Sequence, residues 1–138
     1  MDIDTTNKPS DSERETFEQS YRNFIDALEV LAKNPEEQCN IMGWYNVAWE
    51  LKDDISTGRF LLKVSRGYLS DSEQNSISNL LTEIEKLPKE IFHESKTEKE
   101  NLKSMRNTHW VAVRILANEL IEILKPATAK NESFFEIN

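Results

Sequence analysis

Residues 105–124, MRNTHWVAVRILANELIEIL, form a largely apolar stretch around which the rest of the chain can be organised. The stretch is too long for a β-strand and too charged to span a membrane. Apolar residues occupy most positions around a helix drawn through it, which predicts packing partners on several sides. We therefore expect this segment to be the central helix of a bundle, and a charge placed at Leu116 to unfold the protein. Its charged residues after position 109 are Arg114, Glu119 and Glu122.

The size and charge of the chain limit its fold and its partners. Its 138 residues predict one domain over positions 1–138. It contains 25 acidic and 17 basic residues, which gives a formal net charge of −8. This balance argues against direct binding of nucleic acid, because phosphate contacts need clustered lysine and arginine. It is compatible with a basic protein partner.

The cysteine content and the N-terminus indicate a cytoplasmic location. The single Cys39 cannot form an internal disulfide, which is typical of a reducing compartment. The polar, acidic N-terminus lacks the basic and apolar regions of a secretory signal. No apolar run long enough to span a membrane is present. We expect a cytoplasmic protein without a membrane segment.

Apolar periodicity predicts two helices in the first half of the chain. The first begins near Ser10, after a disordered arm at residues 1–10, and ends before Pro35. The second occupies residues 35–58, with Gly58 as its left-handed C-cap. Gly43 lies inside this second helix, where we expect either a kink or a close crossing with another helix.

The second half of the chain predicts further helices and a tail. Residues 59–66 fit a helix or a short strand, and we favour a helix because no partner strand is evident. Capping-box patterns at 70–73 and 97–100 start two more helices, the second of which continues into the central one. Residues 126–138 form a tail. The predicted fold is therefore an all-α, single-domain, antiparallel bundle of four to six helices.

Few residues in the chain are suited to catalysis or metal binding. Glu90 and His93 have the spacing of a di-metal carboxylate bundle, but the second Glu-x-x-His motif that such a site needs is missing. We predict no metal, no cofactor and no catalytic residue. Arg106 and His109 faintly resemble the Arg-polar-His signature of the helical HEPN ribonucleases, although their spacing is shorter than in that family. A ribonuclease that uses these two residues is the alternative function.

Residues 35–58 combine large aromatic residues with acids. This segment contains five acidic residues and one basic residue, a net charge of −4. Aromatic rings beside carboxylates suit an interface with a basic protein, because rings anchor a desolvated contact and carboxylates steer the partner. The alternative is that all of the rings are core and the acids form a solvated face. The candidate partner-binding residues are Trp44, Tyr45, Trp49, Glu50, Asp53 and Asp54.

In its small size, acidity and helical pattern, with aromatic residues next to acids in GWYNVAWELKDD, the chain resembles bacterial immunity proteins of toxin–immunity pairs. The resemblance implies a non-catalytic inhibitor that neutralises a basic toxin nuclease domain. Trp44, Tyr45 and Trp49 are then the anchors, and Glu50, Asp53 and Asp54 pair with lysine or arginine. A third possibility is a homo-oligomeric structural or regulatory protein, a homodimer for example, that docks through Phe134 and Phe135.

Overall fold

The computed structural model describes residues 11–92 and 97–137, and the side chains of residues 12–92 and 97–131. The expected arm at residues 1–10 and the side chains of Phe134 and Phe135 lie outside this part. The elements of the described part are all helical, so the all-α class is confirmed. In chain order they are α1 (Asp11–Leu31), α2 (Pro35–Met42), α3 (Val47–Ser56), α4 (Gly58–Val64), α5 (Asp71–Glu85), the 3-10 helix η2 (Lys89–Phe92), α6 (Glu98–Met105), α7 (His109–Ile123) and α8 (Lys125–Ile137).

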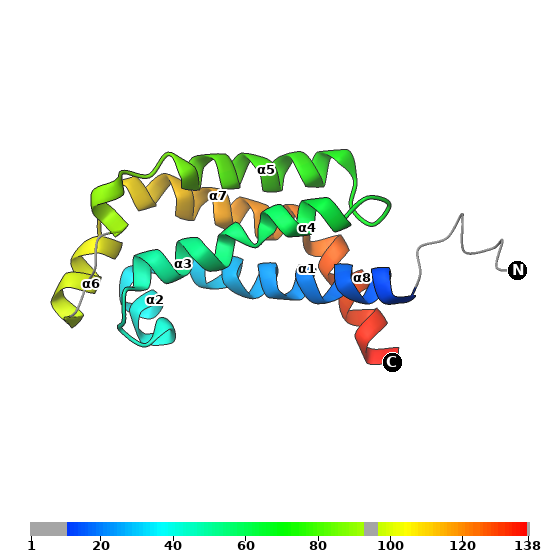
Figure 1. The fold of residues 1–138 in the computed structure, drawn as a ribbon, viewed down its shortest axis with the longest axis horizontal. Helices are drawn as coiled ribbons and strands as arrows, with labels where there is room; N and C mark the ends of the chain where they lie inside the picture. Colours follow the sequence, from blue (N-terminus) through cyan, green and yellow to red (C-terminus); the bar gives the residue numbers. More distant parts are fainter. Residues whose placement is uncertain (1–10, 93–96, 138) are drawn as a thin grey trace, which may run out of the picture.

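The centre of the fold is α1. It packs against α3 and α4 on one side and against α7 on another, with α2 and α8 at its ends. Figure 1 shows α3 and α4 lying along α1, α5 beside α7, and α2 and α6 together at one end. The side chains of Phe24, Leu28 and Leu31 on α1 are completely buried. The central position that the sequence predicted for residues 105–124 therefore belongs to α1.

The apolar segment at residues 105–124 is divided and only partly buried. Residues 106–108 separate α6 from α7, so the predicted long helix is two helices. The face of α7 that carries Val113, Ala117 and Leu120 is buried, whereas Ile115 is 54% exposed. Leu116 is only partly buried. Unfolding by an inserted charge is therefore expected at the buried face of α7 and not at Leu116. The physical reason is that the helices in contact with α7, mainly α1, α5 and α8, do not surround it.

The predicted helix at 35–58 is also divided, and its two glycines have exchanged roles. Gly43 is the left-handed C-cap of α2 with φ 81°, and a Cβ there would meet nothing within 4 Å. Gly58 begins α4, and a Cβ there would lie 2.7 Å from Cε1 of Phe24. Of the kink and the close crossing considered for Gly43, neither occurs inside a helix, because α2 ends there. A close crossing is found at Gly58, where the missing side chain lets α4 approach α1.

The remaining expectations are confirmed only in part. Residues 59–66 are helical up to Val64 as part of α4. The capping box at the start of α5 is complete, because Oγ of Ser70 accepts from N of Glu73 at 3.1 Å and Oε1 of Glu73 accepts from N of Ser70 at 2.8 Å. The predicted tail is instead the helix α8, which begins at Lys125. The predicted number of helices and their antiparallel order are not confirmed.

Candidate protein-binding surface

The connection between α2 and α3 has an unusual backbone. Gly43, Trp44 and Asn46 have φ values of 81°, 62° and 39°, which lie in the left-handed region. Residues other than glycine rarely adopt this conformation, and each instance costs roughly 1–3 kcal/mol unless the surrounding structure holds it. The loop at residues 43–46 therefore needs external support.

Asn101 of α6 supplies that support. Its side chain is completely buried, and its Nδ2 donates to the carbonyl oxygens of Trp44 at 2.8 Å and Thr97 at 2.9 Å. Its Oδ1 accepts from the backbone N of Val47 at 2.8 Å. The amide thus holds both ends of the strained turn. Because both N–H donors and the oxygen of this amide are used, the loop is anchored to α6 by hydrogen bonds within the chain itself.

Two of the three predicted aromatic anchors are at the surface. Tyr45 is 63% exposed and Trp49 is 51% exposed. Trp44 is partly buried against the core, and its Nε1 donates to Oδ1 of Asn40 at 2.9 Å. The alternative in which all three rings are core is therefore wrong. Trp44 packs under the loop, Tyr45 is exposed on the loop, and Trp49 is exposed on the first turn of α3.

The three predicted carboxylates lie on α3 beside these rings. Asp53 and Asp54 are exposed and Glu50 is partly buried. Partial burial raises the pKa of Glu50, and the neighbouring Asp54 raises it further. Although Asp54 is exposed by surface area, desolvation by the surrounding atoms raises the pKa of its carboxyl, with a further contribution from Asp53. Among the residues that the structure describes, none of the three forms an ion pair, so their mutual repulsion is not neutralised within the chain.

The surface is hollowed next to these carboxylates. A shallow depression of about 380 Å³ lies between α1 and the end of α3. The nearest basic residue on α3, Lys52, places its Nζ 4.6 Å from the ring centroid of Phe92, which is a cation–π contact with η2. The depression has one carboxylate on each of the two helices, Asp26 on α1 and Asp54 on α3. It is lined by Asn23, Asp26, Ala27, Val30, Asp54 and Thr57.

The structure separates Arg106 from His109. They are on different elements, because Arg106 caps α6 and His109 begins α7. Arg106 forms an ion pair with Glu36 of α2, and this contact lowers the pKa of that carboxyl. Nδ1 of His109 is 2.8 Å from Oδ1 of Asn107. Arg106 and His109 thus contact different partners, Glu36 and Asn107, and no hydrogen bond joins the two within the described residues.

Comparison with known proteins adds no family. A scan against protein-family models, a search of curated proteins and a search of solved structures each returned no match.

Two remaining expectations concern metals and membranes. Within residues 11–92 and 97–137, no group of three or more histidine, cysteine, aspartate or glutamate side chains could hold a metal ion. His93, the histidine of the Glu-x-x-His pattern, lies outside the described residues. In the same part of the chain, no helix has the length and apolarity needed to cross a membrane. Cys39 is completely buried, and this burial raises the pKa of its thiol.

Sequence reasoning missed two exposed apolar side chains near the surface described above. Ile41 of α2 is 52% exposed and Phe60 of α4 is 50% exposed. The break at residues 43–46 separates Ile41 from α3, with which a continuous helix at 35–58 would have aligned it. The one signal that could have found this break is Gly43, because glycine commonly ends a helix.

Proposed function

We propose that this protein is a non-catalytic binding module of the immunity or inhibitor type, which neutralises a basic toxin domain. One observation carries the proposal: Tyr45 and Trp49 are more than half exposed, at 63% and 51%, next to the unpaired carboxylates of α3. Large exposed rings are the residues that most often dominate the energy of a protein interface. The carboxylates define the partner as basic.

The loop geometry supports a binding role for the rings. A partner that binds a mobile loop must first order it, which lowers the affinity. Here the hydrogen bonds of Asn101 to Trp44 and Val47 already hold the loop that carries Tyr45. The strained backbone is maintained at this one connection, and such strain is common where a protein holds a ligand.

The repulsion between neighbouring carboxylates of α3 supports the basic character of the partner, although it is second to desolvation in raising the pKa of Glu50 and of Asp54. Both carboxyl groups lack an opposite charge within the described residues, and each raises the local density of negative charge. A lysine or arginine of a partner would relieve this repulsion and lower both pKa values. The net charge of −8 would also attract a basic domain over a longer range.

The proposal is tested by reversing the charge of the surface. The probe is the protein encoded next to this chain in its genome, expressed as a catalytically inactive domain. We expect Asp53→Lys/Asp54→Lys to stay folded, as measured by circular dichroism, and to associate with the probe about tenfold more slowly or worse. The salt dependence of its association rate should also become weaker.

The control variant is Glu15→Lys/Glu119→Lys, which changes the net charge equally at exposed positions on α1 and α7. It should slow association much less than the double substitution on α3. If the α3 variant associates at the wild-type rate with an unchanged salt dependence, the assignment of this surface is wrong.

A further inference from the structure

Helices α3 and α4 form one bent, nearly continuous helix. Thr57 between them is right-handed, with φ −60° and ψ −18°, and N of Leu61 donates to O of Thr57 at 3.1 Å. Figure 1 shows the two helices end to end along α1. The helical repeat therefore continues across the junction. It places on one outer line the five residues that we call the α3–α4 ridge, which are Trp49, Asp53, Ser56, Phe60 and Lys63.

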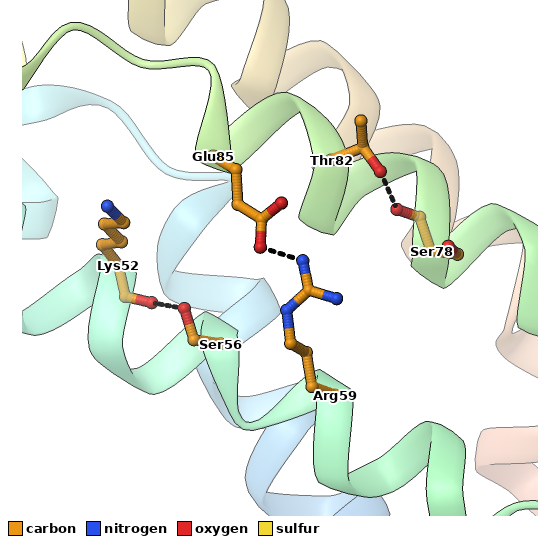
Figure 2. Close-up of polar contacts among 6 residues, drawn as sticks. All are labelled: Lys52, Ser56, Arg59, Ser78, Thr82 and Glu85. Carbon is orange, nitrogen blue, oxygen red and sulfur yellow. Dashed lines mark hydrogen bonds and ion pairs between the residues drawn. The ribbon is translucent and has the colours of Figure 1, made fainter.

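The ridge is exposed and has a small residue at its middle. Trp49 and Phe60 are about half exposed, and Asp53 and Lys63 are exposed. Oγ of Ser56 donates to the carbonyl oxygen of Lys52 at 2.7 Å, as Figure 2 shows. The serine hydroxyl is thus turned back onto its own helix. A second helix could approach closely at this point.

The two halves of the ridge have opposite charge. The α3 half carries the unpaired acids described above. On the α4 half, Arg59 reaches across to Glu85 of α5, as Figure 2 shows. Lys63 and Arg66 are exposed and, within the described residues, form no ion pair. On the ridge itself the two charges are Asp53 and Lys63, which have opposite signs and each lie near an exposed ring. Lys52, which flanks the α3 half, is turned to the ring of Phe92.

These opposite halves are placed symmetrically about Ser56. Trp49 precedes Ser56 by seven residues and Lys63 follows it by seven. At about 1.5 Å per residue, each lies roughly 10 Å from the serine along the helix. A two-fold axis at Ser56 would therefore bring Lys63 of one copy to Trp49 of the other, within a side chain's length of Asp53. Both contacts would form twice, as an isologous interface requires.

We propose that the α3–α4 ridge binds a second copy of this chain in an antiparallel, two-fold arrangement. The charge complementarity of the two halves selects a second copy over an unrelated partner, because every charged contact is made twice. Trp49 and Asp53 belong to both surfaces, so the dimer covers part of the partner-binding surface and competes with the partner. The competition between dimer and partner rests on the proposed function, whereas the self-association does not. Since a single helix pair buries a small area, the dimer is transient.

The test uses charge reversal and mixing, followed by sedimentation velocity of the full chain over a range of concentrations. We expect the wild-type protein to shift from monomer to dimer as its concentration rises, and to dissociate with added salt. Asp53→Lys and Lys63→Glu should each remain monomeric, because like charges then meet at both ends of the interface. An equimolar mixture of the two variants should dimerise again, since both contacts regain opposite charges.

The control is Lys99→Glu at an exposed position on α6. It makes the same charge change as Lys63→Glu and should dimerise like the wild type. The proposal is overturned if the wild type stays monomeric at every concentration, or if the mixed variants do not associate. It is also overturned if dimerisation is insensitive to both reversals, which would place the interface elsewhere. None of these results depends on the toxin-domain probe, so the two proposals fail separately.

Discussion

Helices α3 and α7 both expose large apolar side chains, but for different reasons. On α7 the exposed residues Val111, Ile115 and Ile123 belong to the most apolar helix of the chain, which has more such residues than its neighbours can cover. On α3 the exposed Trp49 stands among acids and follows a strained loop held by Asn101. The apolar content of a helix therefore does not decide how much of it is buried. The number of packing neighbours does.

The largest effect that tests this comparison is expected on α7 itself. Leu120 is 2% exposed and Ile115 is 54% exposed on the same helix. Truncation of a buried leucine removes apolar contacts and leaves a cavity, so Leu120→Ala should lower the free energy of unfolding by about 2–5 kcal/mol. Ile115→Ala should change it by only about 0.5 kcal/mol. Urea unfolding followed by circular dichroism measures both.

Equal losses from the two α7 variants would mean that Ile115 is covered in solution. A dependence of the Ile115→Ala result on protein concentration would point to the same conclusion, because a second molecule must then supply the cover.

An intermediate effect is expected at the loop before α3. Asn101→Ala leaves the buried N of Val47 without its partner, so we expect a loss of about 1–3 kcal/mol in the free energy of unfolding. Hydrogen exchange at the Val47 amide should become faster than at amides of α5. Asn118→Ala, at an exposed position on α7, is the matched control and should have little effect. Unchanged exchange at Val47 would show that the loop does not depend on α6.

The smallest effect concerns pH and the carboxylates of α3. The pKa of Asp54 is raised in the folded protein, so the folded chain holds this proton more firmly than the unfolded chain. The protonated Asp54 carboxyl therefore contributes to the free energy of unfolding at low pH. This contribution is lost as the pH rises above about 4, through the raised pKa of Asp54. Asp54→Asn should remove this loss and make the protein slightly more stable at neutral pH.

Thermal unfolding of wild type and Asp54→Asn across this pH range measures the difference. It should vanish at acid pH, where the wild-type carboxyl is protonated. Glu119→Gln removes one charge at an exposed position on α7 and controls for the change in net charge. A wild-type protein that gains stability relative to Asp54→Asn as the pH rises would contradict the sign of the shift.

Part of the fold and of the candidate surface follows from local patterns. The capping box at Ser70 and Glu73 is formed by neighbours in the chain, and the structure confirms it. The roles of Gly43 and Gly58 could not be assigned in this way. Either glycine can end a helix, and only the position of Phe24 on α1 requires a missing side chain at residue 58. The backbone of the loop that carries Tyr45 is likewise held by a hydrogen bond from α6, which lies far along the sequence.

The sequence by itself determined the helical class, most helix starts and the acidic character of the segment that carries Trp49, because these depend on residues within a few positions of one another. Tertiary structure decided which helix is central, which face of α7 is covered and which aromatic rings reach the surface. These outcomes depend on contacts between distant segments, and a local pattern contains no information about how many neighbours a helix will have.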